Sequence, residues 1–380
     1  MSEYQYYEFQ RVDGRLSEKE MQELRAYSTR ARITPTSFIN EYHFGSFKGN
    51  ADAWMEKYFD GFLYLANWGT HEVQLALPSG LLMADTAGRY CSTRTASSRE
   101  KSGKVILTFL SEDEPDGEWL EGEGQLSSLL QIRNELAQGD LRSLYLGWLM
   151  GVQAGELKAS EKEPPVPLNL DNLSGPQANL ADFLCLDPDL LAVAARNSPR
   201  AKFEVANRQE LAFWIASLPV REKDEILVRL MIGEEAKLGM ELQARFHRQR
   251  DPNDAAAVVK GRPVSELLAA AEAHRQERQK EQARRAATAK ADRLRQEAIA
   301  RGRHLDSLQG RSETIWATVE TLVASRLPKS YDQVVQHLGD LGDLADREVH
   351  QADFKNRLAA FRNQHAAKKS LLDRLAKGGL

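Results

Sequence analysis

The fold of the N-terminal region is decided by the stretch FLYLANWGTHEVQLAL, residues 62–77. Phe62–Asn67 and Glu72–Leu77 are rich in large apolar residues and have the composition of strands. Between them, Asn67-Trp68-Gly69-Thr70 is typical of a tight turn, because Gly69 can adopt a positive φ at little cost. We therefore predict a β-hairpin here.

The residues on either side of the hairpin extend this prediction. Further strands are predicted at Tyr4–Gln10, Ile33–Phe44 and Lys104–Leu110 from their aromatic and aliphatic content. Ser17 and Glu20 form a capping box that starts a helix running to about Ala26, and Asn50 caps a second helix over Ala51–Phe59. The order of elements predicts an α+β domain over residues 1–123, with a mixed or antiparallel sheet and helices on one face.

From Gly124 onward the apolar residues recur with the 3.6-residue period of helices. Residues 124–250 are predicted to form a helical domain, interrupted by a proline-rich loop at 158–176. Its later helices are expected at 179–184, 188–195, 209–217, 222–231 and 235–248, and a break is expected at 250–254. The region after it is also helical.

Residues 263–303 are predicted to form a long charged arm, with the helix itself over Ser265–Arg303. Strong helix formers fill this segment, and a helix of that length would extend about 58 Å. One narrow stripe, suited to coiled-coil-like contact with another helix, consists of Ala269, Ala273, Gln276, Lys280, Ala283, Ala287, Ala291, Leu294 and Ala298. Residues 304–380 are predicted to form a small three-helix bundle, with a second capping box at Ser330–Gln333 and a last helix from Phe354 to Leu375.

Composition narrows the class of protein. The chain has 380 residues, two cysteines and a net charge of −4, which divides into −7 over residues 1–160 and +3 over residues 161–380. This balance excludes a globally basic nucleic-acid protein, and two cysteines exclude a disulfide scaffold. The N-terminus has no signal peptide, and no run is long enough to span a membrane, so we expect a cytoplasmic protein.

One group of polar residues is a candidate ligand-binding or partner-binding cluster. Arg30 and Arg32 alternate on one predicted strand, as do Glu41 and His43, and Trp68 and His71 lie on the hairpin. Two arginines can bind an anion, and a Glu–His pair can act as acid and base. The alternative is an exposed sheet face with ordinary ion pairs, and this alternative is favoured.

A second group of candidate contact residues lies on the arm and consists of Arg278, Lys280, Arg284, Arg285, Arg293 and Arg295. Basic residues of the arm fall around the whole helix and alternate with acids, which favours a solvated helix over a phosphate-binding face. The acidic loop 112–118, continuing through Glu121 and Glu123, is interpreted as a solvated loop, with docking onto a basic surface as the alternative.

Catalytic and metal-binding motifs are absent from the sequence. It contains no glycine-rich phosphate loop, no nucleophile elbow and no Cys–His metal spacing. His365 lies on an apolar helix stripe and is interpreted as a bundle residue. No cofactor and no metal are therefore expected.

Two parts of the sequence resemble known families. SEYQYYEF (residues 2–9), STRARITPTSF (28–38), Asn40-Glu41-Tyr42-His43 and YLANWGT (64–70) resemble a family of uncharacterised bacterial proteins, which implies no activity for this chain. The C-terminal pattern of Trp316, Tyr331-Asp332, the leucines to Leu344 and LLDRL (371–375) is similar to the helical tail of bacterial SWIM zinc-finger proteins. The zinc ligands of a SWIM finger are missing here, so the similarity implies only a shared partner or a pathway that involves nucleic acid.

The sequence leaves three functions open. The leading hypothesis is a non-enzymatic cytoplasmic interaction or scaffold subunit of a bacterial multi-protein system, with protein partners and an oligomeric state that the sequence does not determine. The second is association with nucleic acid through the basic C-terminal half, which has a net charge of +8 over residues 236–380. The third is an enzyme that uses the Arg30, Arg32, Glu41 and His43 cluster.

Overall fold

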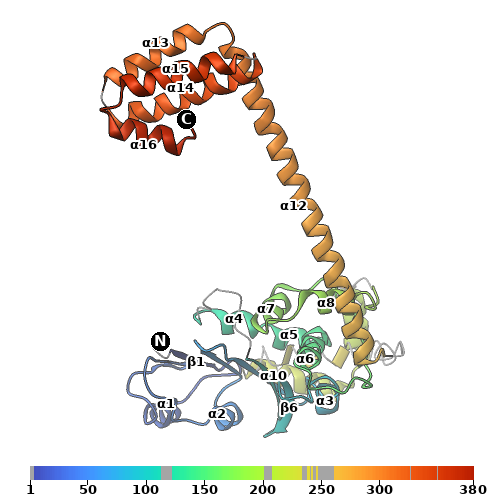
Figure 1. The fold of residues 1–380 in the computed structure, drawn as a ribbon. Coiled ribbons are helices and arrows are strands. Elements are labelled where there is room, and N and C mark those ends of the chain that lie inside the picture. The colour runs from blue at the N-terminus through green and yellow to red at the C-terminus, as the bar shows by residue number, and fades with distance from the viewer. Residues whose placement is uncertain are drawn as a thin grey trace. The chain divides into compact units, whose positions relative to one another are not determined.

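The structure is a computed structural model of the chain (Figure 1). It describes residues 4–112, 122–200, 208–232, 238–239, 241–242, 245–246, 261–325, 327–348 and 350–380. The chain divides into two compact units, residues 1–278 and 279–380, and each is described by itself. The four-part division made from composition stays a prediction.

The first unit contains a seven-stranded antiparallel sheet with the strand order β2-β3-β1-β4-β5-β7-β6. This confirms the predicted α+β class. Its strands are β1 Gln5–Gln10, β2 Arg32–Thr34, β3 Ser37–Tyr42, β4 Gly61–Ala66, β5 His71–Pro78, β6 Ala96–Lys101 and β7 Lys104–Ser111. The predicted hairpin is the β4–β5 pair, and Gly69 in its turn has a φ of 91°.

Two details of the sheet differ from the sequence prediction. The single strand expected over Ile33–Phe44 is a hairpin of β2 and β3 that turns at Pro35-Thr36, where the hydroxyls of Thr34 and Ser37 are hydrogen bonded at 2.7 Å. Strand β6 was not predicted because its sequence, ASSREK, is polar. It lies at the edge of the sheet, where β7 is its one neighbouring strand among the described residues, so its side chains need not be apolar.

Helices cover both faces of the sheet, so the expectation of helices on one face was wrong (Figure 1). Helices α1 (Glu18–Arg25) and α2 (Ala51–Lys57) pack on one face, around Phe9, Phe38 and Trp54. Both start as predicted, since Ser17 forms a capping box with Glu20 and Asn50 accepts from the Ala53 backbone. The other face lies against helices that follow in the chain.

The second face of the sheet is buried by helices from both sides of residue 124. They are α3 Ala84–Tyr90, α4 Gln125–Leu129, α5 Ile132–Ala137, α6 Arg142–Gln153, α7 Gly175–Phe183 and α8 Pro188–Ala195. Their apolar side chains form one core with Leu63, Val73 and Leu107 of the sheet. Close packing of α6 depends on Gly147, because a Cβ there would lie 2.6 Å from the ring of Phe109.

Helices α9 (Arg208–Ser217) and α10 (Val220–Met231) follow where the sequence predicted them. Of the helix predicted over 235–248, only residues 238–239, 241–242 and 245–246 are described, and these are helical. The break predicted at 250–254 lies outside the described residues, as does most of the acidic loop, of whose acidic residues only Glu112 and Glu123 are described.

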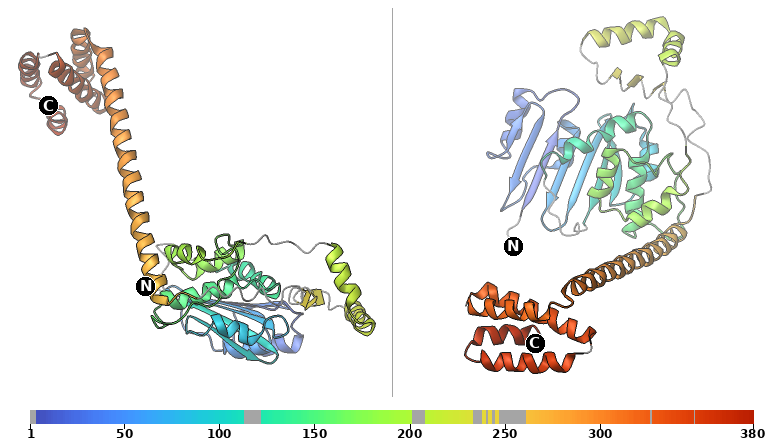
Figure 2. Two further views of the ribbon diagram at one scale, coloured as in Figure 1. Left: turned by 90° about the vertical axis from the view of Figure 1, so that its right-hand side faces the viewer. Right: turned by 90° about the horizontal axis from the view of Figure 1, so that it is seen from above.

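The long helix α12 is continuous from Val264 to Leu308, 45 residues, and contains the predicted helix over Ser265–Arg303. The second unit continues with α13 Ser312–Ala324, α14 Pro328–Arg347, α15 Gln351–Gln364 and α16 Lys369–Lys377 (Figure 2). Their apolar side chains, including Trp316, Leu338 and Phe361, form a separate core.

Two predictions about this bundle were wrong. The last helix is divided into α15 and α16, because residues 365–368 form a turn. Ser330 is not an N-cap, since α14 already starts at Pro328, whose fixed φ suits the first turn of a helix. Among the described residues, no helix is both long and apolar enough to cross a membrane.

Candidate functional site

The polar cluster predicted on the sheet is not gathered into a site. Arg30, Arg32, Glu41 and His43 are all exposed, and Arg32 forms an ion pair of 3.6 Å with Glu123. Within the described part of the chain, no hydrogen bond or ion pair joins any two of the six predicted residues. Arg30 precedes β2 and His43 follows β3, so neither lies on a strand as the sequence predicted.

Trp68 and His71 face different surroundings, although they lie on the same hairpin. Trp68 is exposed in the turn, whereas His71 is buried against Phe183 with ring centroids 5.7 Å apart. Burial lowers the pKa of His71, and its Nδ1 has no hydrogen-bond partner among the described atoms. His71 is therefore a buried core histidine and not part of a surface cluster.

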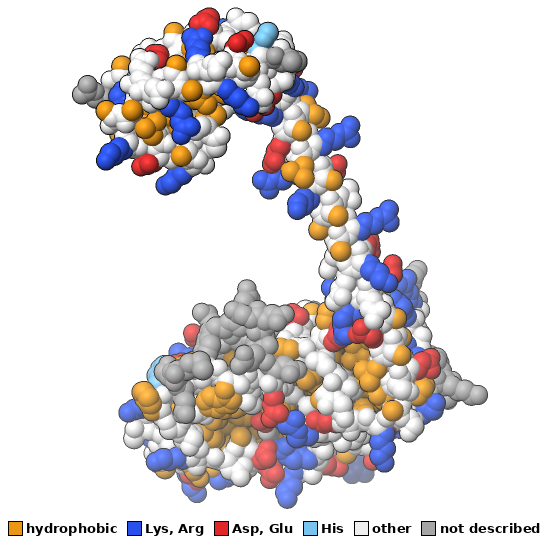
Figure 3. Space-filling model, in the orientation of Figure 1, with side chains coloured by type: hydrophobic (Ala, Val, Ile, Leu, Met, Phe, Trp, Pro, Cys, Tyr) orange, Lys and Arg blue, Asp and Glu red, His pale blue; other side chains and the backbone are white. Residues whose placement is uncertain are grey.

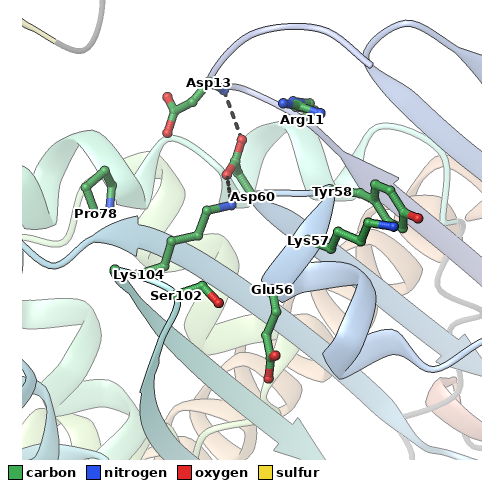
Figure 4. A pocket seen from close by; sticks show the side chains of 10 residues that line it. Arg11, Asp13, Glu56, Lys57, Tyr58, Asp60, Pro78, Ser102 and Lys104 are labelled. Atoms are coloured by element: carbon green, nitrogen blue, oxygen red, sulfur yellow. Dashed lines mark hydrogen bonds and ion pairs between the residues drawn. The ribbon is translucent and has the colours of Figure 1, made fainter. Parts of the chain in front are cut away.

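A polar pocket of about 280 Å³ lies beside the end of β1 (Figure 4). At its base is Asp60, which accepts hydrogen bonds from Lys104 Nζ and from the backbone N–H groups of Val12 and Asp13, each at 2.9 Å. Burial acts to raise the pKa of Asp60, but Lys104 and Arg133 outweigh it and lower that pKa. Asp60 stays ionised and holds the chain where it leaves β1.

The cations around this pocket are already neutralised. Arg11 pairs with Glu20 at 3.3 Å, Lys57 pairs with Glu23 at 2.9 Å, and Lys104 pairs with Asp60. These pairs connect α1 with α2 and with the residue that follows β1, and they connect β7 with the residue that precedes β4, so the pocket is explained as a structural junction.

A second polar network crosses the α2 face of the sheet. Gln74 donates to Glu72 at 2.7 Å and to Asp52 at 3.0 Å, and Arg99 donates to Asp52 at 2.7 Å. Burial raises the pKa of Glu72. This network was not predicted, and its only visible signal in the sequence was the alternation of Glu72 and Gln74 with apolar residues on β5.

The first predicted arm residue, Arg278, holds α12 against α8. The carboxylate of Asp189 is 1% exposed and accepts from Arg278 at 2.7 Å and from His274 at 2.9 Å. The bond from Arg278 lowers the pKa of Asp189 to about 2. Arg278 is therefore an anchor between α12 and α8, and its side chain stays 42% exposed.

The other five arm residues divide into two sets. Arg285 pairs with Glu281, and Arg293 pairs with Glu297, in i,i+4 ion pairs. In the described part of the chain, the side chains of Lys280, Arg284 and Arg295 have no hydrogen-bond or ion-pair partner. At 100° per residue these three lie within about 60° of one another around the helix.

Residues 276–300 of α12 are exposed on every side of the helix. Lys and Arg side chains stand out along it in the space-filling view (Figure 3). A helix that is polar all round and carries several i,i+4 pairs is stable as a solvated helix. The predicted coiled-coil stripe is therefore uncovered over these residues.

A group of exposed apolar residues among the described residues lies on α9 and α10, and it was not predicted from the sequence. We call it the α9–α10 face. It consists of Phe213, Ile215, Val220, Leu227, Val228, Leu230, Met231 and Ile232, of which Phe213 is 81% exposed and Met231 is 85% exposed. Neither helix has a buried residue.

An ordinary surface helix buries its apolar side and exposes its polar side, and α10 does the opposite. Val220, Leu227, Val228 and Met231 fall within about 100° of the helix circumference, and all four are exposed. The opposite side carries Glu222 and Arg229, and it is this polar side that is partnered.

The partners of that polar side are among the described residues that follow α10. Arg245 forms an ion pair with Glu222, and Arg229 pairs with Glu241 at 2.7 Å. The ring of Phe246 meets Trp214 of α9 edge-on, with the centroids 5.5 Å apart. The polar side of α10 is thus held by this chain, and its apolar side is left outward.

Among the described residues, no group of three or more His, Cys, Asp or Glu side chains is arranged to hold a metal ion. Comparisons of the chain with family models, with curated proteins and with solved structures give no match. The two resemblances stated from the sequence therefore stay predictions.

Proposed function

We propose that this chain is a non-enzymatic cytoplasmic interaction protein that binds another protein chain through the α9–α10 face. The observation that carries the proposal is the reversed orientation of α10, whose apolar residues Val220, Leu227, Val228 and Met231 are all exposed. Exposed apolar patches of more than a few hundred Å² mark interaction surfaces in folded proteins. An enzymatic function has less support, because the predicted cluster around Arg30 and Glu41 is spread over an open surface.

The proposal is tested by comparing variants in an affinity capture from the source cells. Leu227→Gln with Met231→Gln replaces two exposed apolar side chains with a residue of similar helix propensity, so α10 should stay folded. Phe44→Gln is the matched control, since Phe44 is an equally exposed residue outside the face. We expect a discrete partner with the wild type and the control and its loss with the double variant. Equal capture by all three proteins would contradict the proposal.

A second candidate function is association with nucleic acid through α12. The observation that favours it is the grouping of Lys280, Arg284 and Arg295, which have no partner among the described residues, on one side of an exposed helix. Three such cations would give a shallow salt dependence, because each phosphate contact contributes a slope of about −0.9 in log K against log salt. Duplex DNA that does not bind at low salt would remove this alternative.

A further inference from the structure

We infer that the partner on the α9–α10 face is a second copy of this chain. This inference rests on the proposed function and adds the identity of the occupant. Both copies would contribute the same exposed apolar side of α10, related by a two-fold axis. Such isologous C2 dimers are the commonest oligomers of soluble proteins.

The amount of apolar surface agrees with one side of a dimer interface. Phe213, Val220, Met231 and Ile232 each expose more than two thirds of their surface, and Ile215, Leu227, Val228 and Leu230 expose roughly half. The six of these residues at positions 220–232 amount to several hundred Å², a large part of the roughly 800 Å² that each partner buries in a standard interface. Homodimer interfaces are also the more apolar class.

The charges around the face permit like-to-like contact. Apart from Glu222 and Arg229, which are paired on the opposite side, helix α10 carries two basic residues (Arg221, Lys223) and two acidic residues (Asp224, Glu225), and α9 carries Arg208 and Glu210. The net charge of both helices is therefore zero. A two-fold axis places a surface against itself, so a face with charge of one sign would repel its copy.

Helix α12 provides the contrast. The side chains of Lys280, Arg284 and Arg295, which lack a partner in the described part of the chain, are all positive, so a copy placed against them would bring like charges together. Its stripe of small residues therefore does not fit a second copy with the same charge pattern. Of these two uncovered surfaces, the α9–α10 face is the one that suits self-association.

The test is the mass of the full chain in solution, measured by sedimentation equilibrium over about 1 to 100 μM, where interfaces of moderate affinity dissociate. We expect a dimer of the 42.7 kDa chain at the upper concentrations. Leu227→Gln with Met231→Gln should raise the dissociation constant at least about tenfold, because two central apolar contacts are lost. Phe44→Gln should leave it unchanged.

Circular dichroism of the double variant checks that its helices are kept. A wild type that stays monomeric throughout this range, or a dimer whose affinity the double variant does not change, would overturn the inference. The proposed function would survive the first result if the affinity capture still showed a partner that depends on the face. Both the proposed function and the inference would fail if the affinity capture showed no partner that depends on the face.

Discussion

At the scale of single residues, the charged side chains buried between elements have the largest effect on stability. The side chain of Glu163 is 2% exposed. Its carboxylate accepts hydrogen bonds from Arg262 at 2.8 Å and from the hydroxyl of Tyr145. Next to it, Gly261 leaves no room for a side chain, because a Cβ would lie 2.0 Å from the Glu163 carbonyl oxygen. These contacts fix the residues just before the start of α12 to the segment around Glu163, within the first unit.

Arg262→Met should therefore lower the free energy of unfolding by about 3–5 kcal/mol, since it leaves a buried carboxylate without its partner. Arg200→Met is the control. Arg200 is 83% exposed and pairs with Asp171, and removing an exposed pair costs about 1 kcal/mol or less. Urea denaturation of the two variants measures the difference. A similar small loss for both would contradict the structural role of Arg262.

Asp189 predicts a pH dependence of stability. Its pKa is about 2 in the folded chain and about 3.9 in an unfolded chain, so between these values the unfolded state binds more protons. The carboxylate's contribution is complete above pH 4 and is lost as the pH falls toward about 2. Asp189→Asn should flatten the fall in unfolding free energy across this window, whereas Asp171→Asn should not. An unchanged slope in Asp189→Asn would contradict the assignment.

The burial of Cys91 leads us to expect that its thiol reacts more slowly in the native chain than in the denatured chain. It is buried in the core of the first unit, and burial raises its pKa to about 12. Because the thiolate is the reactive form, a thiol reagent at about pH 8 should leave Cys91 unmodified in the native chain and should label it after denaturation. Peptide mapping of the labelled site measures this. Rapid labelling of native Cys91 would show that this part of the core is open.

At the scale of elements, the sequence predicts what short-range patterns determine. The capping box at Ser17 and Glu20 and the turn at Gly69 specify their own geometry over four residues, and both were predicted. Strand β6 was not predicted, since an edge strand needs only backbone pairing with β7. The reversed side of α10 was also missed, because periodicity shows that a helix has an apolar side but not whether that side is covered.

The basic side chains of α12 that lack a partner among the described residues lead to a prediction about DNA binding. Lys280→Gln, Arg284→Gln and Arg295→Gln together should abolish any salt-dependent binding of duplex DNA, because they remove these three cations. Arg285→Gln with Arg293→Gln should change binding less, since Glu281 and Glu297 already neutralise those two arginines. Fluorescence anisotropy over a salt series measures both. Equal losses in the two variants would show that general charge is responsible.

At the scale of the whole molecule, the net charge of −4 is a cancellation between an acidic N-terminal region and a basic C-terminal one. The structure does not divide at the same place, since Leu126 and Leu149, in the helical region after residue 124, belong to the same core as the sheet. Composition along the chain does not report which segments pack together. For the same reason the sequence did not indicate that Arg278 binds Asp189, 89 residues away.

The central claim is that the exposed side of α10 meets another chain. A photo-crosslinking amino acid placed at Met231, in the full chain and in its source cells, tests this most directly, with the same group at Phe44 as the control. We predict a discrete crosslinked product at position 231 that is absent at position 44. Its mass should correspond to two copies of the chain. No discrete product at position 231, with the crosslinker incorporated and the chain folded, would contradict a role of the α9–α10 face in association.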